Sequence, residues 1–418
     1  MCCDGRLYGE LLELMGKLIR QLAIAFLAWG AMATSSVSCP RSCDDPPIVP
    51  PDLRSPEINI YSETVLGKNN PVTASALYRV YVPNHSSNTV TVIDPATHKV
   101  IDHFAVGRGP QHIVPSSDLK TLWVANTANQ TTQGSVTPID PLSGKPGKPL
   151  AVNDPYNIYF MPDGSAALVV AEAYHRLEFR DPHTFELQSV IPLPICRGMN
   201  HGDFAADFSY IILTCEFNGM PHGLSGRKNQ TIGVGNGLIK VDLKSRALAS
   251  ALVLSKAGMP QDVRLSANGR TFYVTDMFNA GVFTVDAATF TESGFIHTGI
   301  GAHGLNISRD GRFLYVANRG SKFMPDKPHG NGSISVIDFA TNKVVSSWAI
   351  PGGGSPDMGN VTPDGKELWV AGRFDGQVYA FDTATGSVTK INVGIEPHGL
   401  TVWPQPGRFS LGHTGNMR

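Results

Sequence analysis

Short apolar segments, some of them alternating between apolar and polar side chains, dominate the sequence from residue 76 onward. One recurring phrase is almost continuously apolar, as in VYVPN (80–84) and LYVAN (314–318). A second phrase alternates and ends in aspartate, as in TVTVID (89–94) and SISVID (333–338). Apolar runs of about four to eight residues are typical of β-strands, and the alternation predicts strands buried on one face.

The alternating phrase is repeated seven times, and neighbouring copies lie 41 to 61 residues apart. A turn ending in Asp-Gly, such as MPDG (161–164) and TPDG (362–365), precedes most copies of the apolar phrase. Each unit therefore predicts four short strands, and such a unit of about 40–50 residues is typical of a propeller blade. Because one blade cannot bury both of its faces, the blades must close into a ring. The sequence predicts an all-β fold, a seven-bladed β-propeller with four-stranded blades.

The two ends of the repeat region predict how the ring closes. The chain begins in the middle of a blade, with strands expected at 78–82, 89–93 and 99–105, and it ends with PHGLTVW (397–403). That last segment would supply the missing inner strand of the first blade. Closure by N- and C-terminal strands removes an open sheet edge, which would otherwise invite aggregation.

An aspartate closes each alternating phrase, once per blade. Asp side chains accept hydrogen bonds from backbone amides two residues further on, which stabilises turns. We therefore interpret the seven aspartates as turn residues and not as catalytic groups: Asp94, Asp140, Asp181, Asp242, Asp286, Asp338 and Asp382.

The N-terminus has the pattern of an export signal. Residues 22–33 are an apolar run of 12, preceded by Lys17 and Arg20. This run is too short for an ordinary transmembrane helix and suits a signal peptide. We assign residues 1–38 to the signal, with Met15 as an alternative start, and expect export to the periplasm, the cell surface or the extracellular space.

Three outcomes remain open for this signal. In the first, the signal is cleaved after residues 31–33 (AMA). In the second, Cys39 carries a lipid, because Ser36-Val37-Ser38 before it resembles a bacterial lipoprotein box. In the third, the segment stays uncleaved as a membrane anchor. Membrane contact is expected only through the signal or a lipid on Cys39. Residues 39–75 begin Pro-rich and predict an extended tether and lead-in, so the propeller occupies residues 76–418.

Charge and cysteine usage narrow the function classes. Lys plus Arg is 34 and Asp plus Glu is 35, so the chain lacks the basic footprint of a nucleic-acid-binding protein. Of the six cysteines, only Cys196 and Cys215 lie in the predicted folded part. Export would permit a disulfide between them, and two separate buried thiols are the alternative.

The Y-V-A/T-N phrase followed by V-x-V-I-D resembles the YVTN repeat of secreted and surface-layer seven-bladed β-propellers. The resemblance extends over about residues 76–403 and implies a propeller of the nitrous oxide reductase N-terminal-like superfamily. The Trp-Asp signature of true WD40 repeats is absent. Members of the family resemble binding scaffolds, lactonases and metal-dependent oxidoreductases, so the fold alone does not decide the function.

Polar side chains stand where the chain enters each predicted inner strand, which in a propeller is the mouth of the central channel. Four entries carry histidine, and the registers of these residues differ by one. Because side chains alternate along a strand, we expect two layers and not a single tetrahedral four-histidine site. The entries carry His112, Asn157, His201, Asp262, His303, Asp357 and His398.

A metal site is one interpretation of these histidines. Neutral imidazoles suit copper, zinc or iron, and the likeness to relatives of nitrous oxide reductase favours copper among the divalent metals. We take His201, His303 and His398 as the candidate ligands, with His222 from the long loop 215–237. The alternative is that each histidine hydrogen-bonds the neighbouring blade.

The leading functional prediction is a scaffold that binds a small molecule or a protein at the channel mouth, under the long loops 215–237 and 318–333. The candidate ligand-binding residues are His112, Asn157, Asp357, Arg319 and Arg373. The alternative is a metal-dependent oxidoreductase or a lactonase-like hydrolase at the same place. Its candidate bases are Glu216 and Asp262.

Overall fold

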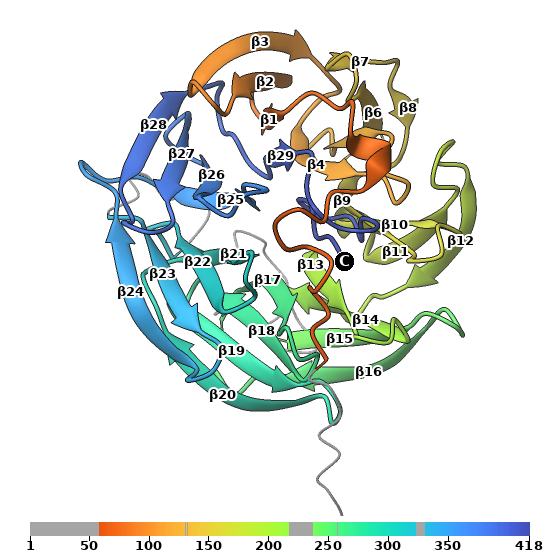
Figure 1. The fold of residues 1–418 in the computed structure, drawn as a ribbon. Coiled ribbons are helices and arrows are strands. Elements are labelled where there is room, and N and C mark those ends of the chain that lie inside the picture. The colour runs from red at the N-terminus through yellow and green to blue at the C-terminus, as the bar shows by residue number, and fades with distance from the viewer. Residues whose placement is uncertain (1–57, 130, 132, 217–236, 257, 323–330) are drawn as a thin grey trace, which may run out of the picture. The chain divides into compact units, whose positions relative to one another are not determined.

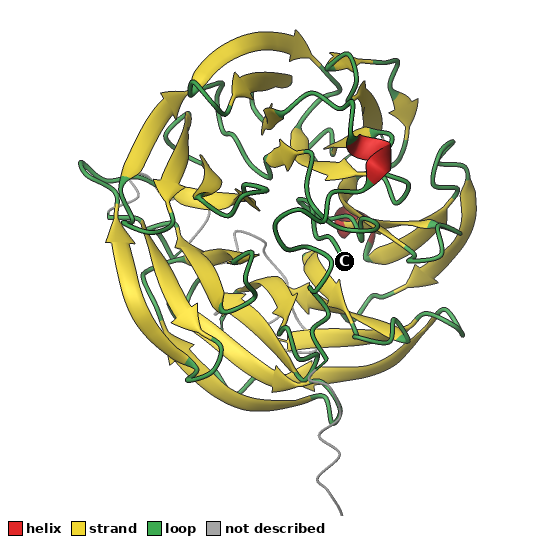
Figure 2. Cartoon of the chain, in the orientation of Figure 1, coloured by secondary structure: helices red, strands yellow, loops and turns green. Residues whose placement is uncertain are grey.

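The computed structural model describes residues 58–129, 131, 133–216, 237–256, 258–322 and 331–418, all within one compact unit, Ser55–Arg418. Seven antiparallel sheets are arranged around a central channel (Figure 1), and nearly all of the regular structure is strand (Figure 2). The predicted all-β, seven-bladed propeller is confirmed. The predicted signal peptide, Cys39 and His222 lie outside the described residues.

Blades 1 to 3 follow the chain from the first strand onward, and β29 from the end of the chain belongs to blade 1. Blade 2 has a divided outer edge, where β7 and β8 both pair with β6. The strands are β1 (Arg79–Asn84), β2 (Thr89–Asp94), β3 (Lys99–Ala105) and β29 (Thr401–Trp403) in blade 1; β4 (Pro110–Pro115), β5 (Leu122–Asn126), β6 (Ser135–Asp140), β7 (Lys145–Pro146) and β8 (Leu150–Ala151) in blade 2; β9 (Pro155–Phe160), β10 (Ala167–Ala171), β11 (Arg176–Arg180) and β12 (Leu187–Pro192) in blade 3.

Blades 4 to 7 each contain four consecutive strands, ordered from the channel outward. Two short 3-10 helices, η1 (Pro71–Thr73) and η2 (Glu172–Tyr174), lie outside the sheets. The strands are β13 (Met199–Phe204), β14 (Tyr210–Cys215), β15 (Gly237–Asp242) and β16 (Ala247–Val253); β17 (Pro260–Leu265), β18 (Thr271–Asp276), β19 (Gly281–Asp286) and β20 (Thr291–His297); β21 (Ala302–Ile307), β22 (Phe313–Asn318), β23 (Ser333–Asp338) and β24 (Lys343–Ala349); β25 (Pro356–Val361), β26 (Glu367–Gly372), β27 (Gln377–Asp382) and β28 (Val388–Asn392).

The apolar phrase forms the second strand of each blade, and this strand is buried on both faces. In blades 3 and 4, Leu168 and Val170 of β10 share one hydrophobic cluster with Ile211 and Leu213 of β14. Outer strands such as β16 are largely exposed. The core is therefore a series of apolar layers between neighbouring blades, and it holds every inner strand beside the channel.

The predicted closure of the ring is confirmed. β29 pairs antiparallel with β1, with Val80 opposite Val402 and Tyr81 opposite Thr401. The turn aspartates also act as expected: Asp94 Oδ1, for example, accepts the backbone amide of Ala96 at 3.1 Å. Blade 1 is thus made from both ends of the described chain.

A C-terminal tail, residues 404–418, turns back from β29 into the channel, where the chain end marked C lies inside the ring (Figure 1). The backbone of Leu411 accepts the amide of Phe160 at 3.0 Å, and the amide of His413 donates to Ile158 at 2.7 Å. At the end of the tail, the Arg418 guanidinium lies 3.2 Å from the buried carboxylate of Asp203. The tail therefore fills the end of the channel that lies opposite the inner-strand entries.

A disulfide joins Cys196 and Cys215, so the first of the two alternatives left open by the sequence is correct. Both residues are fully buried. The bond ties the link that enters β13 to the end of β14. It thereby ties together the two segments that carry His201, within β13, and Glu216, directly after β14.

We expect that removing this disulfide destabilises the fold without changing its architecture. Cross-linking a loop of this length restricts the unfolded chain and is worth about 3 kcal/mol in the chain-entropy model. The double variant Cys196→Ala/Cys215→Ala should lose about that free energy of unfolding in a denaturant titration. Reductant should destabilise the wild-type protein and leave the double variant unchanged; equal stability of the two proteins would contradict the expectation.

Candidate functional site

The inner strands begin with a β-bulge, and this irregularity gives the channel its polar lining. In β13, Met199 pairs with Cys215 and Gly202 with Leu213, so Asn200 and His201 together face a single residue, Thr214. β17, β21 and β25 have the same two-against-one arrangement, and β4 has a related shift. A bulge re-aims a side chain that would otherwise point into the sheet. Two consecutive residues can therefore both face the channel.

The bulges produce two layers, as the differing registers predicted. The upper layer, next to the mouth, comes from the second position of each inner-strand entry, and the lower layer comes from the third. The Thr214 hydroxyl supports the bulge in β13 by accepting the amide of His201 at 3.1 Å. The upper layer contains Gln111, Tyr156, Asn200, Gln261, His303, Asp357 and His398, and the lower layer contains His112, Asn157, His201 and Asp262, all of them buried.

A cavity of about 270 Å³ lies at the mouth, above these layers. Its rim is built from the residues that directly follow the second strands. Two of them, Arg319 and Arg373, are predicted ligand-binding residues, and Glu216 is a predicted base. The rim residues that line the cavity are His85, Thr127, Glu172, Glu216, Arg319 and Arg373.

Opposite charges are paired on the side of the mouth formed by blades 6 and 7. Arg319 Nη2 lies 2.9 Å from both oxygens of the Asp357 carboxylate, and Arg373 Nη2 lies 3.1 Å from Glu396. Burial raises the pKa of Asp357, but the nearby Arg319 and His303 outweigh it and hold the pKa well below its ordinary value. Asp357 is therefore ionised, and its charge is balanced by Arg319.

The upper cluster consists of His303, Asp357 and His398, whose candidate ligand atoms lie within 4.8 Å of one another. His303 Nδ1 lies 2.7 Å from Asp357 Oδ1. The two atoms are close, but His303 Nδ1 is a buried atom without a hydrogen bond of good geometry. Burial and the charge of Arg319 lower the pKa of His303, which favours a neutral ring.

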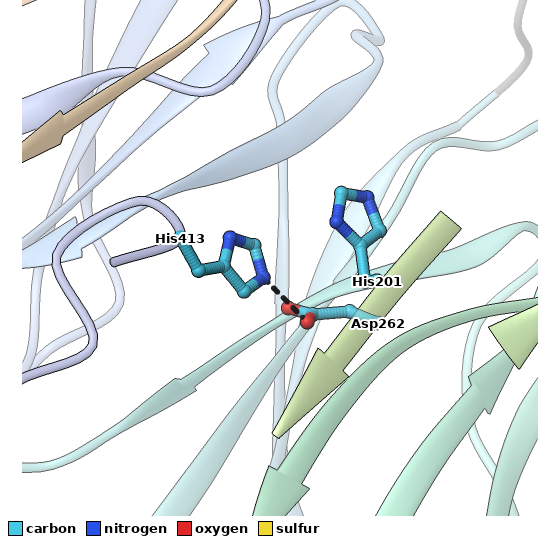
Figure 3. Close-up of side chains that lie close together, drawn as sticks. All are labelled: His201, Asp262 and His413. Atoms are coloured by element: carbon cyan, nitrogen blue, oxygen red, sulfur yellow. Dashed lines mark hydrogen bonds and ion pairs between the residues drawn. The ribbon is translucent and has the colours of Figure 1, made fainter. Parts of the chain in front are cut away.

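The lower cluster consists of His201, Asp262 and His413 (Figure 3). His413 Nε2 donates to Asp262 Oδ1 at 2.8 Å, and His413 Nδ1 accepts the amide of Thr414 at 2.8 Å. His201 Nδ1 accepts from the Asn157 amide at 3.1 Å. Every one of these polar contacts lies inside the protein, so the cluster forms a hydrogen-bonded floor.

Asp262 is satisfied on both of its oxygens. Besides His413, Oδ1 accepts the amide of Val263 at 2.8 Å and Nη1 of Arg264 at 3.0 Å. Oδ2 accepts the amide of Leu305 at 2.8 Å. Of the two predicted bases, Glu216 is the one that reaches the cavity.

His112 differs from the other channel histidines. It is fully buried, and neither of its ring nitrogens has a hydrogen-bond partner. Burial and the field of His413 hold its pKa well below the ordinary value, so the ring is neutral. Its ring centre lies 4.7 Å from that of His398 in the upper layer and 5.2 Å from that of His201 in the lower layer. His112 therefore connects the two clusters.

The structure brings the predicted channel residues together and changes their grouping. His201, His303 and His398 all lie in the channel, but they do not form one group: His201 belongs to the lower cluster and the other two to the upper one. His413, which the sequence analysis did not assign, completes the lower cluster. It stands outside the repeat, so no periodic signal identifies it, and only the path of the tail brings it into the channel.

Glu396 links the rim to the closure of the ring, because Oε2 lies 3.2 Å from His85 Nδ1 while Arg373 contacts Oε1. Burial raises the pKa of Glu396, but the hydrogen bond from His85 and the charge of Arg373 outweigh it and lower the pKa to about 2. A carboxyl group whose pKa falls on folding stabilises the protein at pH values above its pKa in the unfolded chain, which is 4.5 here. That contribution is lost as the pH falls towards about 2.

We expect Glu396→Gln to isolate this contribution. The wild type should be the more stable protein above about pH 4.5, and the difference in free energy of unfolding should shrink as the pH falls towards about 2. Denaturant titrations of both proteins across this range measure the difference. A difference that does not depend on pH would show that the carboxylate charge contributes nothing.

The same fold occurs in solved structures of distant sequence. Hydrazine synthase of Kuenenia stuttgartiensis matches with a TM-score of 0.55 and 17% identity over 77% of this chain and 94% of that one. A Bacteroides uniformis protein assigned as a 6-phosphogluconolactonase matches with a TM-score of 0.58 and 16% identity, over 77% and 98% of the two chains. The dihydro-heme d1 dehydrogenase NirN matches with a TM-score of 0.55 and 15% identity, over 79% of this chain and 75% of that one. At these identities the likeness shows the fold alone.

The sequence itself matches the model of one protein family, whereas no curated protein matches the chain significantly. The model of the YNCE-like β-propeller family matches residues 59–193 and 224–406. Among the residues that the structure describes, no helix is long and apolar enough to cross a membrane. Because the family model covers most of the chain, this protein belongs to the YNCE-like β-propellers.

Proposed function

We propose that this protein binds a small polar molecule in the mouth of its central channel. The observation that carries the proposal is a pair of unsatisfied polar atoms: Arg373 Nε and Asn200 Oδ1 are buried and have no hydrogen-bond partner. Both residues line the cavity at the mouth. Since buried polar atoms are rarely left unpaired, a ligand that accepts from Arg373 and donates to Asn200 would satisfy both.

The size of the cavity supports a small ligand. At about 270 Å³, it is slightly smaller than the usual range for small-molecule sites, about 300–1,000 Å³. The two residues belong to blades 4 and 7, on different sides of the ring. A compact molecule with an acceptor or anionic group at one end, for Arg373, and a donor group at the other, for Asn200, would fit these two residues.

The tail makes the site a blind pocket and not a passage. It occupies the far end of the channel, with His413 bonded to Asp262 and Arg418 paired with Asp203. A molecule that enters at the mouth therefore leaves by the mouth. Together with the export signal predicted from the sequence, this supports a scaffold that captures its ligand in the periplasm or at the cell surface. A protein segment inserted into the mouth is the alternative occupant.

Metal-dependent chemistry at the same mouth is the second candidate function. The observation that favours it is the presence of two buried groups of histidine and aspartate whose ligand atoms lie within 4.8 Å. A bound copper or other divalent ion would act as a Lewis acid or redox centre. Glu216, which lines the rim, would then act as the base of an oxidoreductase or a lactonase-like hydrolase.

A panel of small carboxylates, amino acids, sugars and phosphates, screened by thermal shift, tests the binding proposal. We expect at least one class to raise the melting temperature of the wild-type protein, because a ligand that binds only the folded state stabilises it. Asn200→Ala and Arg373→Gln should each reduce the affinity of that compound about tenfold, since each removes one charged or polar contact. Arg312→Gln, on an exposed arginine, is the matched control.

Two results would contradict the proposal. One is a panel in which no compound changes the melting temperature of the wild type. The other is a compound whose affinity is unchanged in both mouth variants, because its site would then lie elsewhere on the propeller.

A further inference from the structure

A second, smaller cavity lies at the far end of the channel, opposite the mouth. It is lined by the ends of the inner strands β17, β21 and β25 and by Thr414–Met417 of the tail. Its volume is about 50 Å³. One water molecule needs about 10–15 Å³, and a small-molecule site usually has about 300–1,000 Å³. This far-end cavity therefore has the size of a small ion and not of a metabolite.

The far-end cavity exists because the tail fills only part of the channel. The fifth residues of β13, β17, β21 and β25 are all polar and buried: Asp203, Arg264, Asn306 and Asn360. The tail bonds the first and the last of them, since Asn416 Nδ2 donates to Asp203 at 2.8 Å and the carbonyl of Thr414 accepts from the Asn360 amide. Within the described residues, no hydrogen bond joins the tail to the two that lie between.

Asn306 is a polar side chain that the protein itself does not satisfy. It is 7% exposed and lines the far-end cavity. Its side-chain amide makes no hydrogen bond with any of the described residues. Buried polar groups are nearly always hydrogen-bonded, to protein or to an ordered molecule. The partner of Asn306 is therefore expected inside the cavity.

The guanidinium of Arg264 is only partly used. Its side chain is 6% exposed. Nη1 donates to Asp262 Oδ1 at 3.0 Å and to the carbonyl of Val263 at 2.8 Å, whereas Nε and Nη2 have no hydrogen-bond partner among the described residues. A guanidinium presents its donors as a planar fork that matches the oxygens of a carboxylate or a phosphate. Arg264 thus has donors left for an anion in the cavity that it lines.

Arg309 brings a positive charge to the same cavity. It donates to the carbonyls of Thr362 at 3.0 Å and Val361 at 2.5 Å and to the Gln405 side chain, and it forms no ion pair within the described part of the chain. Burial lowers the pKa of Arg309 to about 10, although Asp364 opposes this effect, so the group is still protonated at neutral pH. Because buried charges are normally paired, a counter-charge is expected nearby.

We propose that the far-end cavity binds one small oxyanion of the phosphate, sulfate or carboxylate class. Arg264 and Arg309 both line it, and no acidic side chain of the described residues does. Water could satisfy Asn306 but would leave the charge of Arg309 unbalanced, whereas an oxyanion does both. This site lies at the other end of the channel from the mouth and does not depend on the function proposed for the mouth.

The bound anion would hold both ends of the described chain against the propeller. Besides the tail, Tyr61 and Thr64 of the lead-in line the cavity. An anion bonded to Arg264 and Asn306 would therefore lie between the two chain ends and the inner strands of blades 5 and 6. Since it binds only the folded protein, it should raise the melting temperature.

Calorimetric titration of the full chain with phosphate, sulfate and acetate tests the proposal, in a chloride buffer of constant ionic strength. We expect at least one of them to bind at one per chain, and the order of the three affinities distinguishes a tetrahedral from a planar anion. Arg309→Gln should lower the affinity at least about tenfold and Asn306→Leu about tenfold, because each removes a polar contact. Arg312→Gln, on an exposed arginine, is the matched control and should bind like the wild type.

The melting temperature of each anion-free variant separates lost binding from lost folding. Asn306 has no side-chain partner among the described residues, so anion-free Asn306→Leu should melt no lower than anion-free wild type, while the shift caused by the anion should shrink. Arg309→Gln also loses bonds to the Thr362 and Val361 carbonyls. If that variant does not fold, Asn306→Leu carries the test.

Two outcomes would overturn the proposal. The first is a wild type that binds none of the three anions at one per chain. The second is an anion whose affinity is unchanged in both Arg309→Gln and Asn306→Leu. If the affinity of such an anion falls in Arg373→Gln instead, the anion lies at the mouth, which supports the proposed function while the far-end site fails.

Discussion

The β-bulge at the start of the inner strands is the constraint on which the rest of the site depends. A regular strand would send alternate residues into the packed layers between blades. In entries such as β13, the bulge instead turns two successive residues, Asn200 and His201, toward the axis. The apolar second strands hold these entries together at the axis. Stacked rings of polar side chains are the consequence, and the charges and hydrogen bonds of the site follow from their crowding.

Crowding and burial determine the chemistry of the channel. The carboxylates close to the axis are occupied: Asp357 balances Arg319, and Asp262 accepts hydrogen bonds on both oxygens. The imidazoles stay neutral because a second buried positive charge would be unfavourable. What the channel offers to a ligand is therefore a small number of unpaired donors, acceptors and lone pairs at the mouth, and not a net charge.

Repetition explains why the fold could be predicted from the sequence. Seven copies of the two strand phrases predicted the blades, the turn aspartates and the closure by β29, and the one-residue difference in register predicted the two layers. Two features have no periodic signal. His413 belongs to a tail outside the repeat, and the sequence left the bond between Cys196 and Cys215 as one of two alternatives, because it depends on how the link into β13 and the end of β14 meet in space.

Hydrogen-bond saturation is the second limit on sequence-based prediction. Asp262 and His201 were plausible functional residues by type and position. Their partners include the backbone amide of Leu305 in the next blade and the side chain of Asn157 in the preceding one. Such contacts have no sequence signature. The sequence therefore locates the channel mouth but does not separate residues that support it from residues that remain free to bind.

The central claim is that the mouth of this channel is a binding site. Native mass spectrometry of the untagged full chain, isolated from its own host under non-denaturing conditions, tests it most directly. The account predicts one small molecule, one metal ion or both per chain, released when the protein is denatured and absent when Asn200, Arg373 and His398 are all replaced. A wild-type mass equal to that of the polypeptide alone, unchanged after incubation with host extract, would contradict the account.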